Sequence, residues 1–302
     1  MHRDVEFSTK GPWVRGPFRC SDPGLVFGSM YEDSTIELEA CTPLSRVFCI
    51  CSAGCTARAL SAARHDVTAV DINSHQVLYA QARASGAPVR DGAVEQLLAG
   101  ARVFLPLVGW TQPRLRAFLS MHDSAEQHEY WQSSLNSRRW RIAFDSLLSA
   151  VVLGLVYARP FARSMPRRFG SVIRARFERA WRDHPNAGNP YAWRLLMGKG
   201  PSMADPSAHK IRFVCADAAS YLETCKPESF DAFSLSNIAD GASPSYKERL
   251  YRAVKRAAAP SAVVIARSIV ELPIRNNLAA RDRSILWGTV QVTRAEDLCS
   301  TF

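Results

Sequence analysis

The sequence predicts an α/β fold built around a doubly wound parallel sheet. A buried, strand-like run over Val47–Cys51 leads through a turn of small residues into an Ala- and Leu-rich helix over Thr56–Arg64. A second apolar strand over Val67–Val70 ends at Asp71, and strand-like runs resume at Ile211–Cys215. The 302 residues, 47% of them hydrophobic, can bury one large core or two modest ones, which excludes disordered, collagen-like and disulfide-stapled classes.

The other elements follow from the same kinds of pattern. Helical spacing continues over Ser74–Ala84, with Ser74 as the expected N-cap, and a few helical turns are expected over Ser34–Ala40. Strands that alternate with helices on both sides of a long insertion favour one α/β domain. The C-terminal part is predicted to add a strand over Phe230–Leu235, a helix over Tyr246–Ala258, a strand over Ala262–Ala266 and an edge strand over Ile285–Val292.

The chain divides into three predicted regions. Residues 1–45 mix Gly, Pro and aromatic residues and are expected to form an N-terminal arm or lid. Residues 46–91 and 211–302 carry the alternating strands and helices of the α/β domain. Residues 92–210 show helical spacing with many arginines and are expected to form a cap inserted into that domain.

Net charge and cysteine content indicate the class of binding partner and the cellular compartment. The formal charge of +10 and the isoelectric point of about 9.4 favour anionic partners such as phosphates, lipid head groups or acidic small molecules. Several of the cysteines sit inside apolar runs and no secretion signal is visible, so a reduced, cytoplasmic setting is expected. The longest apolar stretch, Leu147–Ala158, is well short of the roughly 20 residues of a spanning helix.

The turn after the first strand predicts a ligand site. Ser52, Ala53 and Gly54 lead into a helix whose free backbone N–H groups suit an anionic or polar ligand. The turn holds one glycine, so it does not match the G-x-G-x-x-G pattern of dinucleotide sites. S-adenosylmethionine has no pyrophosphate to approach the backbone and tolerates a looser turn.

Two acids at strand ends extend this site. Asp71, followed by Ile72, ends the second strand, where a carboxylate can accept hydrogen bonds from both hydroxyls of a ribose. Asp217 follows a third strand, where it could meet an adenine amino group while Ala218 offers a backbone N–H. The alternative for each acid is a helix cap, Asp71 near Ser74 and Asp217 for the helix that follows it.

Three close cysteines raise the question of a metal. Alternation places Cys49 and Cys51 on one face of a buried strand, and Cys55 opens the next helix. Position 58 is Arg58, so the Cys-x3-Cys-x2-Cys cluster of radical enzymes is missing. We therefore interpret these cysteines as small buried hydrophobic residues and expect no metal.

The motifs together resemble a known family. The runs over Val47–Thr56, Asp66–Asn73 and Ser234–Ala242, flanked by Tyr31–Asp33 and Asp282–Gly288, resemble the betaine-lipid type of S-adenosylmethionine-dependent 3-amino-3-carboxypropyltransferase. The resemblance implies a Rossmann-like class I methyltransferase fold with an inserted helical cap. It also implies that S-adenosylmethionine is a co-substrate attacked at the γ carbon of its methionyl chain, with methylthioadenosine as the leaving group.

The resemblance also implies roles for residues outside the first turn. Asn237 would bind the α-carboxylate or α-amino group of the cofactor, with Ser236 as a weaker partner. Asp240 would orient the ammonium group or accept the proton of the acceptor. Tyr31 and Glu32 would close over the cofactor. The alternatives are a turn asparagine and a pair of acids at a helix N-terminus.

The acceptor remains open between three chemistries. The family's best-known acceptor is the hydroxyl of diacylglycerol, isonocardicin synthase transfers to a phenolic hydroxyl, and azetidine-2-carboxylate synthases let the cofactor's own amino group attack. Ordinary methyl transfer is the alternative reaction on the same fold. The alternative that is not an enzyme is a membrane-associating or interaction protein that keeps the fold.

A basic segment bears on the partners. Residues 138–182 hold eleven arginines against Asp145 and Glu178, and the apolar run over Leu147–Ala158 lies among them. Such a helix either contacts the inner face of a membrane peripherally or packs in the core of the cap with arginines at its solvated ends. The aromatic residues interleaved with the arginines could stack nucleic-acid bases, but no nucleic-acid module accompanies them, so we expect no nucleic-acid partner. These residues are Trp131, Trp140, Phe169, Phe177 and Trp181.

Overall fold

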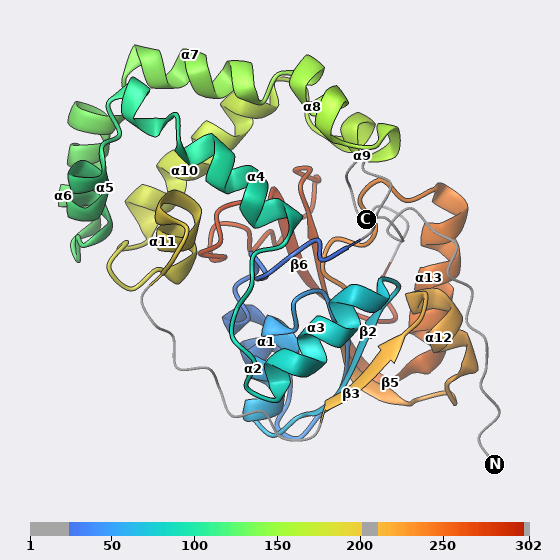
Figure 1. The fold of residues 1–302 in the computed structure, drawn as a ribbon. Helices are drawn as coiled ribbons and strands as arrows, with labels where there is room; N and C mark the ends of the chain where they lie inside the picture. Colours follow the sequence, from blue (N-terminus) through green and yellow to red (C-terminus); the bar gives the residue numbers. More distant parts are fainter. Residues whose placement is uncertain (1–23, 201–210, 299–302) are drawn as a thin grey trace.

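A mostly parallel sheet organises the computed structural model, which describes residues 24–200 and 211–298 (Figure 1). The order across the sheet is β3–β2–β1–β4–β5–β6. The first five strands pair in parallel, and β6 pairs antiparallel with β5. The predicted α/β class is confirmed. The strands are β1 (Arg46–Ile50), β2 (Asp66–Asp71), β3 (Ile211–Cys215), β4 (Phe230–Ser234), β5 (Ala258–Ser268) and β6 (Thr289–Arg294).

Helices cover both faces of the sheet because β1 is apolar on both sides. Phe48 packs on one face with Leu250 and its neighbours. Cys49 packs on the other face with Leu60 and Ala80. Such double coverage explains why the strand is a continuous apolar run and not an alternating one. The covering helices are α1 (Thr35–Ala40), α2 (Cys55–Ala62), α3 (Ser74–Ala84), α12 (Ala218–Thr224) and α13 (Pro244–Ala257).

Some predicted boundaries were wrong. The N-cap of α3 is Asn73, whose side chain accepts a hydrogen bond from the backbone N–H of His75, so Ser74 is the first helical residue. The predicted edge strand over Ile285–Val292 is observed as Thr289–Arg294, so it starts four residues later and ends two residues later. Ile285 has a φ of 78° and belongs to a turn. β5 begins at Ala258, where an irregularity in its pairing with β4 accommodates Pro260.

Every regular element described between β2 and β3 is helical (Figure 1). A separate apolar core holds the cap together, with Trp110 stacked on Trp140 at 4.0 Å between ring centroids. No helix in the described part of the chain has both the length and the apolar character to cross a membrane. The elements that follow α3 are α4 (Ala93–Arg102), η1 (Leu105–Val108), α5 (Gln112–Leu119), α6 (Ser124–Tyr130), η2 (Trp131–Leu135), α7 (Arg138–Leu147), α8 (Ala150–Val156), α9 (Arg159–Ser164), α10 (Phe169–Asp183) and α11 (Pro190–Met197).

The cap core holds all five aromatic residues that could have served a nucleic-acid surface. They are at most 9% exposed, so in this structure none of them is accessible to stack on a base. The burial reflects helical spacing, in which residues three or four apart share one face. These residues are Trp131, Trp140, Phe169, Phe177 and Trp181.

The cap is anchored next to the ends of β4 and β5. A Cβ atom on Gly241, which follows β4, would lie 3.1 Å from the ring of Phe161 on α9, so the two residues pack closely. Tyr191 on α11 donates a hydrogen bond to the backbone oxygen of Glu32 at 2.7 Å. Buried Arg176 on α10 donates to the backbone oxygen of Ile269, just beyond β5. The cap and the sheet are therefore joined by specific contacts near the carboxyl ends of β4 and β5.

The described part of the N-terminal arm also packs on the α/β domain. Gln76 on α3 accepts hydrogen bonds from the backbone N–H groups of Val26 and Phe27, at 2.7 and 2.9 Å. Its amide nitrogen donates to the backbone oxygen of Phe27. Gln76 thereby fixes this stretch of the arm beside the carboxyl end of β2. Residues 1–23 of the predicted arm lie outside the described residues.

Candidate functional site

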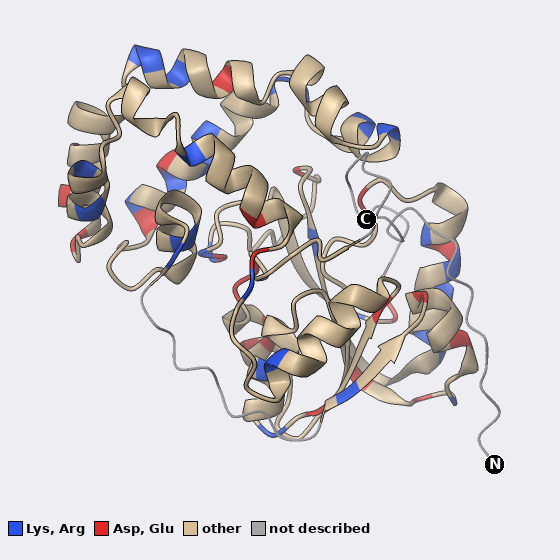
Figure 2. Cartoon of the chain, viewed as in Figure 1, with Lys and Arg blue, Asp and Glu red and all other residues tan. Residues whose placement is uncertain are grey.

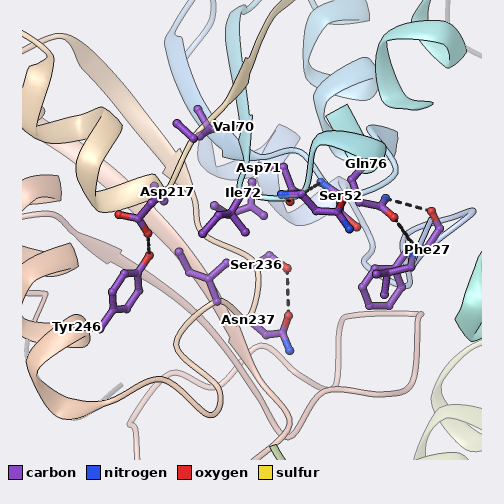
Figure 3. Close-up of a pocket in the computed structure, with 16 residues that line it drawn as sticks. Phe27, Ser52, Val70, Asp71, Ile72, Gln76, Asp217, Ser236, Asn237 and Tyr246 are labelled. Carbon is purple, nitrogen blue, oxygen red and sulfur yellow. Dashed lines mark hydrogen bonds between the residues drawn. The ribbon is translucent and has the colours of Figure 1, made fainter. Parts of the chain in front are cut away.

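A cleft opens at the carboxyl ends of β1, β2 and β4 (Figure 3). Between β1 and β4 the strand order reverses, which is where open α/β sheets bind their ligands. The cleft brings together seven of the residues that the sequence predicted, namely Ser52, Asp71, Ile72, Asp217, Ala218, Ser236 and Asn237. Five others are not among its lining residues, namely Tyr31, Glu32, Ala53, Gly54 and Asp240.

Asp71 connects the first turn to the end of β2. Its carboxylate accepts the backbone N–H of Ser52 at 2.8 Å and that of Asn73 at 2.9 Å, one on each oxygen. A carboxylate has about four acceptor positions, so Asp71, which lines the cleft, can accept further hydrogen bonds from a ligand. Burial raises the pKa of Asp71 to about 6, although the backbone N–H groups act in the opposite direction. The residue therefore both braces the turn and offers a carboxylate to a ligand.

The first turn is shaped by its left-handed residues. Ser52 and Gly54 have φ angles of 43° and 76°, and the N–H of Gly54 closes the turn on the backbone oxygen of Cys51 at 2.7 Å. Ser52 faces the cleft, whereas Ala53 is fully buried and packs with Met30 and Tyr79. Ala53 and Gly54 thus shape the turn, and Ser52 is the side chain that it presents.

Gly54→Ala is expected to destabilise the protein by about 1–3 kcal/mol. The new Cβ would lie 2.9 Å from the Cβ of Ala80, and the φ of 76° is unfavourable for alanine. Gly86→Ala is the matched control, because Gly86 has a φ of 90° but no atom within 4 Å of an added Cβ. Urea unfolding of both variants separates the close approach from the backbone strain. Equal destabilisation of the two variants would contradict the packing role of Gly54.

Asp217 is tied into the start of α12, as the helix-cap alternative predicts. Its Oδ1 accepts the backbone N–H and the hydroxyl of Ser220, both at 2.8 Å. Its Oδ2 accepts the hydroxyl of Tyr246 at 2.6 Å (Figure 3). Burial and the nearby Asp217 carboxylate raise the pKa of Tyr246, so the phenol keeps its proton. The second lone pair of Oδ2 remains for a ligand donor, so capping and ligand binding are compatible.

Asn237 is held in place by Asp240. The amide nitrogen of Asn237 donates to Oδ2 of Asp240 at 3.2 Å, and this oxygen also accepts the backbone N–H of Ile269 at 3.0 Å. The hydroxyl of Ser268 donates to the other oxygen of Asp240 at 2.7 Å. Burial raises the pKa of Asp240, against the effect of these donors. Asp240 therefore positions Asn237 and is engaged on both oxygens.

Behind the cleft lies a buried ion cluster around Arg267 of β5. Its guanidinium contacts three buried carboxylates, those of Glu32 at 3.6 Å, Asp282 at 3.0 Å and Glu37. Burial alone would lower the pKa of Arg267, but these carboxylates raise it well above its ordinary value. Three acids around one cation leave the cluster with an excess of negative charge, which favours a cationic ligand nearby.

Glu32 links this cluster to the cleft. The hydroxyl of Ser236, which lines the cleft, donates a hydrogen bond to Oε1 of Glu32. Burial, followed by the effect of Glu37, raises the pKa of Glu32 to about 7, although Arg267 and Ser236 act to lower it. A carboxylate with a pKa near neutrality that is hydrogen-bonded to a hydroxyl in the cleft can accept a proton through that hydroxyl.

Tyr31 is not among the residues that line the cleft. Its buried hydroxyl has no hydrogen-bond partner among the described residues. The guanidinium of Arg194 on α11 lies 6.0 Å from its ring centroid. Burial is the main cause that raises the pKa of Tyr31 to about 12. The residue therefore packs between the arm and the cap.

Three contributors to the site escaped the sequence analysis. Tyr246 reaches the cleft from α13, Gln76 fixes the arm from α3, and Arg267 organises the acids from β5. No local motif marks any of them. Asp33 pairs with Arg283 across 250 positions of the sequence, and this contact likewise has no local signal.

Of the three cysteines near the site, Cys49 and Cys51 are buried, as predicted, whereas Cys55 is only half-buried and accepts a hydrogen bond from the backbone N–H of Met30 at 3.4 Å. Cys49 and Cys51 are fully buried in β1 and in the residue after it, and burial raises the pKa of both thiols. Such thiols are poor metal ligands, because a metal binds the thiolate. Within residues 24–200 and 211–298, no group of three or more His, Cys, Asp or Glu side chains is arranged to hold a metal ion.

We compared the chain with known proteins at the level of family, sequence and structure. No protein-family model, no curated protein and no solved structure matches the chain. The cleft has a largely apolar lining, with Asp71 and Asp217 after two strands and Asn237 after another. The buried acids around Arg267 lie behind it.

Proposed function

We propose that the protein transfers the 3-amino-3-carboxypropyl group of S-adenosylmethionine to an acceptor hydroxyl. The observation that carries the proposal is one cleft at the strand-order reversal that joins Asp71, the start of α12 and Asn237. The parallel order of β3–β2–β1–β4–β5, with an antiparallel edge strand, also agrees with a class I methyltransferase type of fold. The sequence motifs supply the choice of transferred group.

The lining of the cleft suits a nucleoside. Asp71 would accept the ribose hydroxyls with the acceptor positions that Ser52 and Asn73 leave free. Oδ2 of Asp217 would accept the adenine amino group, next to the backbone N–H of Ala218. The apolar residues that would flank the base are Ile50, Val70, Ile72, Ala216 and Ile238.

The part of the cleft lined by Ser236 and Asn237 suits the amino acid portion of the ligand. Asn237, oriented by Asp240, would bind the α-carboxylate or the α-amino group, with Ser236 beside it. The excess negative charge of Glu32, Glu37 and Asp282 would favour a ligand that carries an ammonium and a sulfonium group. When bound, S-adenosylmethionine supplies an electrophilic γ carbon and a neutral thioether leaving group.

The acceptor oxygen forms a bond to the γ carbon as the bond from this carbon to sulfur breaks, and the electron pair of that bond goes to sulfur. The acceptor proton must leave, and we assign it to Glu32 by way of the Ser236 hydroxyl. Because Asp240 already accepts donors on both oxygens, it positions Asn237. The leaving group needs no acid, so catalysis would rest on positioning and this one proton transfer.

Glu32→Gln is expected to lower kcat by roughly a hundredfold. The wild-type rate should rise as the pH increases through about 7, because the carboxylate form of Glu32 accepts the proton. The glutamine variant should lose this inflection, and Ser236→Ala should lose it as well. The charged and titratable groups that face Glu32 are Arg267, Glu37 and Asp282.

Glu39→Gln is the control for that experiment, because Glu39 is exposed on α1 and pairs with Arg281 at the surface. Its pH profile should match that of the wild type. A Glu32→Gln enzyme that keeps the inflection near pH 7 would show that another group accepts the proton.

The acceptor is tested by mass spectrometry of candidate hydroxyl compounds incubated with the protein and S-adenosylmethionine. A phenol and diacylglycerol in detergent represent the two acceptor classes. A gain of one 3-amino-3-carboxypropyl group on either compound supports the proposal and identifies the class. A gain of one methyl group would contradict it, and a cyclised amino acid with no modified acceptor would replace hydroxyl transfer by attack of the cofactor's own amino group.

A further inference from the structure

The outer edge of the cap exposes a group of large apolar side chains. They lie on η1 and the two residues before it, and on α7 and α8. α7 contacts both η1 and α8, so these elements are neighbours in space. Their exposed fractions range from 47 to 74%. The residues are Val103, Phe104, Leu107, Ile142, Leu147, Val151 and Leu155, and we call them the apolar edge.

Helical spacing explains why these residues face outward. On α8, Leu153 is buried in the cap core, whereas Val151 and Leu155, four residues apart, share the exposed face. On α7, Trp140 packs into the core, and Ile142 is 58% exposed. The apolar run that could have been a core helix is therefore only partly buried. Exposed apolar patches of this kind mark interaction surfaces.

Arginines lie at both ends of the apolar edge. Arg138, Arg139 and Arg141 are exposed in the first turn of α7. Figure 2 shows basic positions in blue along this helix. Arg159 and Arg163 are exposed on α9. Among the described residues, none of these five arginines forms an ion pair. The acid between them, Asp145, pairs with Arg174 at 2.8 Å, so it does not offset the positive charge of the edge.

We propose that the apolar edge and its flanking arginines dock the protein on an anionic lipid bilayer. Aliphatic side chains would enter the region just below the head groups, and the arginines would contact lipid phosphates. A second copy of this chain is disfavoured, because a symmetric contact would bring the arginines of both copies together. Nucleic acid is disfavoured because the aromatic side chains of this segment are buried in the cap core.

The docking face adjoins the candidate site. α8 contacts α9, and Phe161 of α9 packs against Gly241 in the segment that carries Asn237. A bilayer bound at the apolar edge would therefore lie against helices that connect directly to the cleft. The docking proposal does not depend on the reaction, and it holds for any activity at that site.

Sedimentation of the full chain with vesicles tests the proposal. Vesicles of phosphatidylglycerol mixed with phosphatidylcholine should bind the wild type, and vesicles of phosphatidylcholine alone should bind it at least about tenfold more weakly. A variant with both Val151→Glu and Leu155→Glu should bind the anionic vesicles at least about tenfold more weakly. A variant with both Arg138→Glu and Arg139→Glu should show a similar loss.

The matched control carries Leu78→Glu and Val89→Glu, which are 64% and 57% exposed but lie outside the cap. It should bind like the wild type, and thermal melts should show that all variants are folded. Failure of the wild type to bind anionic vesicles would overturn the proposal. So would equal binding by the Val151→Glu, Leu155→Glu variant. A wild-type dimer that this variant breaks, without a change in vesicle binding, would assign the face to a second copy instead.

Discussion

Arg267→Met is expected to lower the free energy of unfolding by about 3–5 kcal/mol, which is the largest stability effect that the structure predicts. The substitution leaves Glu32, Glu37 and Asp282 buried without their shared cation. Arg267 also donates to the backbone oxygen of Asp33 at 3.1 Å, and this acceptor would lose its partner too. Urea unfolding followed by circular dichroism measures the change.

Arg281→Met is the matched control for that experiment. Arg281 pairs with Glu39 at 2.5 Å, but both side chains are exposed, at 58 and 59%. Exposed pairs contribute at most about 1 kcal/mol, so the control should unfold almost like the wild type. Similar stability of the two variants would show that the acids of the cluster do not need Arg267. The comparison separates the loss of the buried cluster from the loss of an arginine side chain as such, because the two substitutions are chemically identical.

Asp71→Ala is expected to weaken S-adenosylmethionine binding by roughly a thousandfold, since two charge-assisted hydrogen bonds to ribose would be lost. Isothermal titration calorimetry measures this directly. The wild-type affinity should also fall as the pH drops below about 6, because the carboxyl group of Asp71 then takes up a proton and accepts ribose hydroxyls less well. Near-normal affinity of the variant would contradict the ribose assignment.

Two further variants separate binding from stability at Asp71. Asp71→Asn keeps an acceptor oxygen for one of the two backbone N–H groups of Ser52 and Asn73, so it should fold while still binding weakly. Asp66→Asn changes the exposed acid at the opposite end of β2 and should leave the affinity unchanged. A loss of affinity in Asp66→Asn would mean that S-adenosylmethionine binding depends on the overall negative charge of β2 and not on the carboxylate of Asp71 in the cleft.

The first strand, turn, helix and strand could be predicted from sequence because their signals are local. The apolar run of β1, the small-residue turn and the Ala-rich α2 follow one another directly. The predicted bounds of β1, α2 and β2 agree with the structure to within one or two residues. Asp71 and Asp217 were identifiable for the same reason, since Asp71 ends one strand and Asp217 stands two residues after the end of another.

The C-terminal strands were harder to predict because pairing decides their ends. β6 is set by its antiparallel register with β5, in which Ser268 lies opposite Thr289 and Val263 opposite Arg294. The apolar residues at Ile285 and Trp287 suggested an earlier start, but they pack inward from a turn. A local hydrophobic pattern does not distinguish an inward-facing turn from a strand.

The inner part of the site was not predictable from any local pattern. Arg267 and Glu37 are 230 positions apart, and Tyr246 and Asp217 come from different helices. Glu32 was predicted near the cofactor, but its hydrogen bond from Ser236 depends on the fold bringing residues 204 positions apart together. Such buried polar contacts follow from the topology, so sequence patterns of the single elements do not reveal them.

The most direct test of the proposed reaction identifies the nucleoside product when the purified protein is incubated with S-adenosylmethionine and the acceptor mixture. The proposed reaction predicts methylthioadenosine, formed by the wild type and lost in Asp71→Ala, because the bond between sulfur and the γ carbon is the one that would break. This product is expected whether the acceptor is a lipid, a phenol or the cofactor's own amino group. S-adenosylhomocysteine as the product would instead establish methyl transfer and contradict the proposed reaction.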